Sequence, residues 1–181
     1  MKIIHIALLV IILAGVGFNS FYFCVWQASK KKLVIYSFQG CVNAGYPVSE
    51  SYPAQCRTPD GKSFSEYIGN ELEKVGLITV NDPRPNQKVF SLLTVSGQAR
   101  GYWFFEASFP IKLYDSGGNL LATAIAQAQG EWMTENFVPF KTELVFDVPM
   151  EGDGVLVFEK DNPSGLPEYD DKLIVPIKFS R

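Results

Sequence analysis

The residue types that could carry out catalysis are few, and the scarcity of histidine limits them most. His5 is the one histidine of the 181-residue sequence. Ser-His-Asp and Cys-His catalysis both need a histidine next to the nucleophile, so neither is expected after residue 5. Gly97, Gly101, Gly117 and Gly118 fall in an expected strand or at turns, whereas phosphate-binding loops open a helix. Nucleotide-binding motifs are therefore absent as well.

Carboxylates and tryptophans lie close together in one stretch of the sequence. Glu106, Glu131 and Glu135 are near Trp103 and Trp132, and such a group could form a sugar-cleaving cleft. Aromatic side chains at this density are more typical of a core or of a patch that meets a partner. We therefore predict no enzymatic activity and no catalytic residues. The aromatic side chains that we take as candidates for an interface are Trp103, Phe104, Trp132 and Phe137.

Metal ligands are present in the sequence without the spacing of a known site. Zinc needs about four Cys or His ligands, and the one histidine, His5, lies in the apolar segment expected at the membrane, so a zinc site is not expected. Calcium takes oxygen ligands from loops, and an acidic connection between strands is the alternative interpretation of such residues. We predict no metal and no other cofactor. The oxygen donors that could serve calcium are Asp153, Asp161, Asn162, Glu168, Asp170 and Asp171.

Two cysteines have the spacing of a disulfide. Cys41 and Cys56 are separated by 15 positions in a segment that contains proline and glycine. They are expected to form a bond if the compartment is oxidising, and two free thiols are the alternative. Cys24 follows Phe23, whereas bacterial lipid attachment needs a small residue at that position, so lipidation is not expected.

The N-terminal segment is long and apolar enough to cross a membrane. From Ile3 to Ser29 no residue carries a formal charge at neutral pH, and a helix of this length would span roughly 40 Å against a hydrocarbon core of about 30 Å. We predict a transmembrane anchor over residues 1–29, in contact with the membrane through residues 3–29. A signal peptide cleaved near Gly17 is the alternative, but apolar residues continue well beyond that point.

The orientation of this anchor depends on the cysteines rather than on charge. Lys2 and the terminal amine lie before the apolar segment and Lys30, Lys31 and Lys32 lie after it, so the two sides are almost evenly charged and the positive-inside rule does not choose between the two orientations. A disulfide favours an oxidising compartment. We therefore predict a single-pass protein of the cell membrane with its C-terminal domain outside the cytoplasm.

The charge balance excludes one class of partner. Removing the four lysines of residues 1–32 from the 16 basic residues leaves 12 against 19 acidic residues, a net charge of −7 for residues 33–181. Nucleic acid binding needs a cationic face, so it is not expected. Nine of the acids lie between Glu143 and Asp171, which is typical of a solvated rim or of a surface for a basic partner.

The sequence between the anchor and residue 77 is expected to be a linker. Residues 30–76 contain the basic flank, an apolar run at Leu33–Phe38 that could be a strand, and the two cysteines. Ser63 and Glu66 have the spacing of a capping box before a short helix that would end near Lys74. We take this segment as a small disulfide-clasped unit.

Residues 77–181 have the alternating pattern of short strands. Phe109, Ile111 and Leu113 alternate with polar residues, and Pro110 suggests an edge strand or a bulge. Turn residues at 115–119 lead into a run with alanine at every second position from 122 to 128, for which a helix is the alternative. About seven such strands and no long amphipathic helix predict an all-β, immunoglobulin-like antiparallel sandwich. The seven segments are 77–80, 92–99, 107–114, 121–129, 142–148, 155–158 and 173–179.

Several motifs of this region are similar to one bacterial family. They are the SGQAR turn, the FFEASF strand, the D-x-G-G-N hairpin loop, the GEWM segment, the PF entry to the next strand and the PSGLPE loop. Over residues 77–180 the sequence resembles the immunoglobulin-like domain of bacterial spore germination. The resemblance implies a non-enzymatic cell-surface β-sandwich, and it implies no ligand. The sequence lacks a companion domain of the kind found in germination proteins, so a role in spores does not follow from it.

These observations predict a membrane-anchored module outside the cytoplasm that binds a protein or a polymer of the cell envelope, or that organises the envelope. The alternative is an envelope enzyme or enzyme inhibitor. Its working part would be either the Glu106, Glu131 and Trp132 region or the loop between Cys41 and Cys56. A concave site with two neighbouring carboxylates would favour the enzyme, whereas exposed aromatics on an acidic face would favour the binding module.

Overall fold

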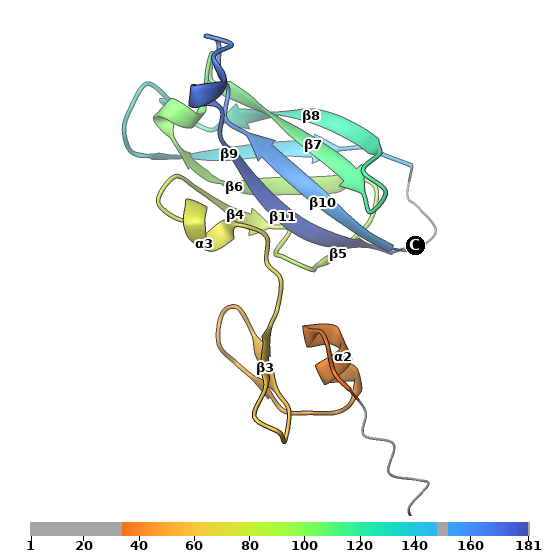
Figure 1. The fold of residues 1–181 in the computed structure, drawn as a ribbon. Coiled ribbons are helices and arrows are strands. Elements are labelled where there is room, and N and C mark those ends of the chain that lie inside the picture. The colour runs from red at the N-terminus through yellow and green to blue at the C-terminus, as the bar shows by residue number, and fades with distance from the viewer. Residues whose placement is uncertain (1–33, 148–151, 181) are drawn as a thin grey trace, which may run out of the picture. The chain divides into compact units, whose positions relative to one another are not determined.

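The computed structural model describes residues 34–147 and 152–180. The predicted anchor at residues 1–29, its alternative cleavage near Gly17, and the residues His5 and Cys24 lie outside the described residues. In the part that is described, no helix is both long and apolar enough to cross a membrane. Two compact units are distinguished, and Figure 1 shows the elements of both.

The first unit is a small clasp formed by the described residues up to Val48 together with Cys56–Phe64. Helix α2 (Phe38–Asn43) begins where the Ser37 side chain accepts a hydrogen bond from the Gly40 N–H at 3.0 Å. A disulfide joins Cys41 of this helix to Cys56, as the sequence predicted. The strand expected at Leu33–Phe38 was wrong, because the described part of that run precedes the helix without forming a strand and Phe38 is the first residue of the helix.

A three-stranded sheet accompanies this helix, in the order β1 (Val48–Ser49), β2 (Gln55–Arg57) and β3 (Ser63–Ser65). The capping-box prediction was wrong, since Ser63 lies in β3. The helix that follows, α3, covers only Glu71–Lys74.

Gly69 precedes α3 with a φ of +73°. A Cβ on this residue would lie 1.8 Å from the Ile174 carbonyl oxygen, so only glycine fits there.

The second unit contains residues 49–55 and 65–181, and an eight-stranded curled sheet forms its body. Each of the seven expected strands overlaps an observed one, but the strand expected at 142–148 was misplaced, because β9 begins at Phe137 and ends at Leu144. The eighth, β5, was missed because it has only two residues, and it pairs in parallel with β11, so the sheet is not wholly antiparallel as predicted. The order across the sheet is β4 (Ile78–Asp82), β6 (Leu93–Arg100), β9 (Phe137–Leu144), β8 (Leu120–Ala128), β7 (Ser108–Asp115), β10 (Gly152–Glu159), β11 (Lys172–Phe179) and β5 (Lys88–Val89).

The core face of β7 and β8 follows the alternation that the sequence predicted. Phe109, Ile111 and Leu113 of β7 are fully buried. In the register of the two strands these large side chains lie opposite Ala126, Ala124 and Ala122. Small residues on β8 leave room for their large cross-strand neighbours on one face of the sheet. The alanine-rich run is therefore a strand, and the alternative helix was wrong.

A chain of aromatic contacts crosses the interior between strands that are not neighbours in the sheet order. Phe140 of β9 packs edge-on against Phe109 of β7 at 5.0 Å between ring centroids, and it lies 6.1 Å from Phe158 of β10. Phe104 extends the chain at 5.1 Å from Phe109. The two parts of the curled sheet meet at β8 and β9, which pair at only two positions, Gln127↔Lys141 and Ala128↔Phe140. The two parts of the sheet thereby enclose one core.

Pro110 suggested that its strand lies at an edge of the sheet, and this prediction was wrong. β7 is internal and pairs with both β8 and β10. The β10 ladder begins only at Ile111↔Phe158, whereas Pro110 is opposite Ile125 of β8. Proline lacks an N–H, and it is tolerated here because one side of the strand is unpaired at this residue.

A charged network fixes the segment 49–55 within the second unit. Glu71 is only 5% exposed. Its carboxylate accepts hydrogen bonds from the Tyr52 hydroxyl and, at 3.0 Å, from Nη1 of Arg84. The guanidinium of Arg84 also donates to the Val80 carbonyl at 2.7 Å and lies 5.3 Å from the centroid of the Tyr52 ring. Both partners of Glu71 offset the cost of burying its charge.

Replacing both Cys41 and Cys56 with serine should loosen the clasp and leave the curled sheet unchanged. The clasp core consists of Ile35 and the two cysteines, with partly buried apolar residues around them. Closing a loop with a separation of 15 contributes about 3 kcal/mol on the chain-entropy model. We expect hydrogen exchange of the α2 amides to accelerate while the amides of β7 and β10 keep their protection. Unchanged protection of α2 would contradict this account.

Tyr52 should make stability depend on pH in the alkaline range. Partial burial of the phenol, followed by its hydrogen bond to Glu71, raises the pKa of Tyr52 from 10.0 to about 12. The folded state holds this proton more tightly than the unfolded state, so the contribution is complete below pH 10 and is lost as pH rises toward 12. Denaturant midpoints measured across this range should fall more steeply for the wild type than for Tyr52→Phe. Equal slopes in the two proteins would show that the phenol is not coupled to folding.

Candidate functional site

Three loops meet at one end of the curled sheet, and we call them together the loop surface. They are residues 101–107, 129–136 and 160–171 (Figure 1). The Gly101 N–H donates to the Asn136 carbonyl at 3.1 Å, which joins the first loop to the second. The Asp161 N–H donates to the Trp103 carbonyl at 3.0 Å, which joins the first loop to the third. The loop surface is thus built around residues 101–107.

The first loop is anchored by two aromatic side chains that are among the predicted interface residues. Trp103, at the end of the 3-10 helix η1 (Gly101–Trp103), is fully buried, and Phe104 is 4% exposed. The indole N–H of Trp103 has no hydrogen-bond partner among the described residues, so packing alone holds this side chain. In this structure Trp103 and Phe104 are core residues and offer no surface to a partner.

The other two candidates are half-buried. Trp132 packs against the core cluster from the second loop. Phe137 lies under the Arg100 guanidinium, which is 4.1 Å from the centroid of its ring. Arg100 also donates to the carbonyls of Gly76 and Glu135, so its charge is used within the unit. Trp132 and Phe137 therefore contribute to packing within the unit.

The exposed apolar side chains are the sequence neighbours of the predicted ones. Tyr102 is 51% exposed, Phe105 is 40% exposed and Met133 is 74% exposed. In the third loop Leu166 and Tyr169 are also exposed. Strand periodicity could not show which aromatics face outward, because the 3-10 helix η1 and the turn after it interrupt the alternation.

The tip of the first loop has an unusual backbone. Glu106 has a φ of +48° and Ala107 a φ of +62°. Phe105 and Ser108 exchange backbone hydrogen bonds across them at 3.0 and 3.1 Å, so the two residues form the centre of a tight turn. Positive φ at both central positions normally selects Asn or Gly. Residues held in such conformations cluster at binding sites and other functional sites.

The carboxylates near the loops are exposed. Glu106, Glu131 and Glu135 all face solvent, as do Glu168 and Asp170 of the third loop. The Glu131 carboxylate accepts a hydrogen bond from the Met133 N–H at 3.0 Å. The surface is therefore acidic and carries apolar side chains among its charges.

A hollow of about 520 Å³ adjoins the third loop, and its charged side chains are largely paired. Lys74 and Asp171 form an ion pair at 2.6 Å. Glu159 bonds to Lys112 at 2.7 Å. This hydrogen bond raises the pKa of Lys112, because it outweighs the lowering effect of burial. The lining residues are Asn70, Glu73, Lys74, Glu159, Lys160, Asp170, Asp171 and Lys172.

Three of the six oxygen donors considered for calcium, Asn162, Asp170 and Asp171, are bonded to other side chains. The Asn162 side chain donates to the Leu166 carbonyl and to Asp170, the latter at 2.7 Å. Asp171 is paired with Lys74, and Asp153 lies on β10 rather than in the third loop. Across residues 34–147 and 152–180, no group of three or more His, Cys, Asp or Glu side chains is arranged to hold a metal ion.

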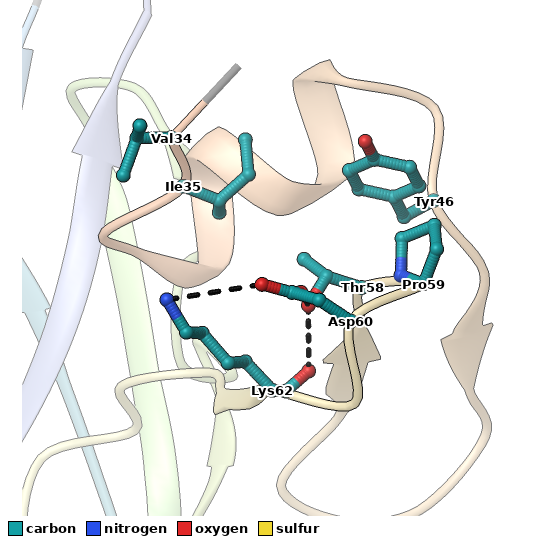
Figure 2. A pocket seen from close by; sticks show the side chains of 7 residues that line it. All are labelled: Val34, Ile35, Tyr46, Thr58, Pro59, Asp60 and Lys62. Atoms are coloured by element: carbon teal, nitrogen blue, oxygen red, sulfur yellow. Dashed lines mark hydrogen bonds and ion pairs between the residues drawn. The ribbon is translucent and has the colours of Figure 1, made fainter. Parts of the chain in front are cut away.

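The clasp has a hollow of its own, of about 470 Å³ (Figure 2). Its apolar walls are Val34, Ile35, Tyr46 and Pro59, and Figure 2 shows Asp60 beside Lys62. The Thr58 hydroxyl donates to Asp60 at 2.5 Å, and Lys62 lies 3.8 Å from the same carboxylate. Of the residues that line this hollow, only Tyr46 belongs to the loop between Cys41 and Cys56. The hollow has room for a small apolar group.

The close approach at Gly101 should be essential for the loop surface. A Cβ at this position would lie 1.9 Å from the Thr134 carbonyl oxygen and 2.2 Å from that of Trp132. Gly101→Ala must displace the second loop, and we expect a loss of about 1–3 kcal/mol in the free energy of unfolding. Gly76→Ala is the matched control, because a Cβ there has no neighbour within 4 Å. Equal denaturation midpoints for the two variants would contradict the packing described.

The comparison with known proteins concerns this second unit. Residues 77–165, just under half of the chain, match the model of the immunoglobulin-like domain of bacterial spore germination. No curated protein matches the chain. The match ends before β11, although β11 pairs with β10 along eight positions and completes the core. The resemblance predicted from the sequence is confirmed over residues 77–165, which match the family of immunoglobulin-like domains of bacterial spore germination.

Proposed function

We propose that this protein is a non-enzymatic binding module that is displayed outside the cytoplasm and uses the loop surface to hold a protein or a polymer of the cell envelope. The observation that carries the proposal is the exposure of Tyr102, Phe105 and Met133 on loops whose bases are fixed in the core. Exposed aromatic and methionine side chains are enriched in interfaces, because they bury a large area at low cost in conformational entropy.

The loop surface also indicates the chemistry of the partner. Five exposed acids lie on the same three loops as the apolar side chains, whereas Arg100 is engaged with Phe137 and with backbone carbonyls. Acids and exposed apolar side chains on one surface are complementary to a partner with basic groups beside apolar ones. The five acids are Glu106, Glu131, Glu135, Glu168 and Asp170.

The proposed location follows from the sequence and the clasp. A disulfide between two fully buried cysteines is typical of an oxidising compartment. The apolar run at residues 3–29 would attach the module to the membrane. Immunoglobulin-like domains present their loops at the ends of the sandwich, so a tethered domain of this kind can reach a partner in the envelope.

The proposal is tested by photo-crosslinking in intact cells of the source organism. A photoreactive amino acid at Phe105 of the full-length chain should form a covalent product with the partner. The same group at Leu92, which is more exposed than Phe105 and lies at the opposite end of β6, should not. Reversing the two charges with Glu106→Lys and Glu131→Lys should lower the yield about fivefold, since two surface charges contribute on the order of 1 kcal/mol.

Location is read in the same experiment. Protease added to the intact cells before lysis should digest the product if the module lies outside the cytoplasm. Equal yields at Phe105 and Leu92 would overturn the assignment of the loop surface. A product that resists protease until the cells are lysed would overturn the location.

A further inference from the structure

β8 has one free edge, which the function proposed above does not use. It pairs with β7 along its length, but it pairs with β9 only at Gln127 and Ala128. Within the described residues, the stretch from Leu120 to Ala126 has no ladder on its other side. Figure 1 shows β8 at the border of the sheet with β7 as its neighbour.

The register shows which backbone groups face this free edge. The Ala128 N–H donates to the Ala107 carbonyl at 2.9 Å, next to the first β7 pair. Hydrogen-bonded and non-hydrogen-bonded pairs alternate along an antiparallel ladder. The N–H and C=O groups of Ala126 and Ala124 therefore face β7, and those of Thr123 and Ile125 face outward. The Gln129 N–H fits this alternation, since it donates outward to the Pro139 carbonyl of β9 at 2.7 Å.

β8 differs from the other borders of the sheet. Natural sheets protect a free edge with charge, proline, a bulge or a very short strand. β4 has a register shift and ends before Pro83, and β5 has only two residues. β9 carries Lys141 and Glu143. β8, with the sequence LLATAIAQA, has no charge and no proline, and its one register shift is at Leu121, so Ala122 to Ala126 form a regular edge. Its Leu120 and Ile125 are 54% and 48% exposed.

We propose that two copies of this chain pair through β8, antiparallel and with the two-fold axis at Ala124. In this register Thr123 of each copy is opposite Ile125 of the other, so the outward N–H and C=O groups satisfy one another. The two Ala124 residues form the close, non-hydrogen-bonded pair at the centre, where Cα atoms lie about 4.5 Å apart. Alanine is small enough for that approach.

Self-pairing fits this edge because the edge brings no charge against its own copy. Like charges placed opposite each other destabilise a strand pair, and β8 contains none. The nearest charge on the neighbouring strand is Lys112, opposite Thr123 in the register, and it is already bonded to Glu159. An isologous antiparallel contact is also closed, so it gives a dimer rather than a fibre. The contact is short, which makes a weak dimer the expectation.

Disulfide cross-linking of the full-length chain in its membrane tests this arrangement. In a Cys24→Ser background, Ala124→Cys should form a covalent dimer on mild oxidation, because a Cα separation of about 4.5 Å lies within the range of disulfides. Gln127→Cys is the matched control, since Gln127 is on the same strand but is already paired with Lys141 of β9. We expect about tenfold more dimer from Ala124→Cys than from Gln127→Cys.

A second substitution tests whether the dimer depends on the outward-facing backbone groups of β8. Adding Ile125→Pro to Ala124→Cys removes an outward N–H without removing a bond to β7, so the fold should persist and the cross-link should be lost. If thermal unfolding shows that the proline variant is misfolded, Ile125→Lys, which leaves the backbone intact and places a charge at the edge, is used in its place. The proposal is overturned if Ala124→Cys does not cross-link, if the control cross-links equally, or if the edge substitution leaves the yield unchanged.

Discussion

The contact of Phe140 with Phe109 and Phe158 is the interaction on which the second unit depends. β8 and β9 share only two residue pairs, so backbone hydrogen bonds alone would leave the two parts of the sheet weakly joined. The Phe140 ring, carried by β9, packs on rings of β7 and β10 and closes the interior. Gly97 is required beside it, because a Cβ there would lie 2.7 Å from the same ring and 2.2 Å from the Thr79 carbonyl oxygen. A curled sheet with one continuous core follows from these contacts.

The same packing determines what is left at the surface. Trp103 and Phe104 enter the core, which holds the first loop in place and turns Tyr102 and Phe105 outward. Hydrogen bonds to Asn136 and from Asp161 then bring the other two loops to that position. The loop surface and the free edge of β8 are therefore separate consequences of one architecture. One is an end of the sheet, and the other is a border where the sheet curls.

Local patterns were sufficient to predict the strands, and they failed where tertiary contacts decide. The alternation around Ile111 and the alanines of β8 predicted both the strands and the crowded core face. β5 escaped prediction because two residues have no period, and its pairing with β11 depends on residues far along the chain. The spacing of Ser63 and Glu66 was misleading, since Ser63 is in a strand and the Glu66 carboxylate accepts a hydrogen bond from Asn86. The bonds of Glu71 to Tyr52 and Arg84 join residues whose spacing carries no signal.

The most direct test of the central claim is hydrogen exchange of the full-length chain, measured amide by amide. If the aromatic contacts make the second unit one cooperative body, the slowest amides of β6 and β9 must open with the same free energy as those of β7, β10 and β11. That result is predicted even though β8 and β9 share only two pairs. Two distinct opening free energies, one for each part of the sheet, would contradict the account.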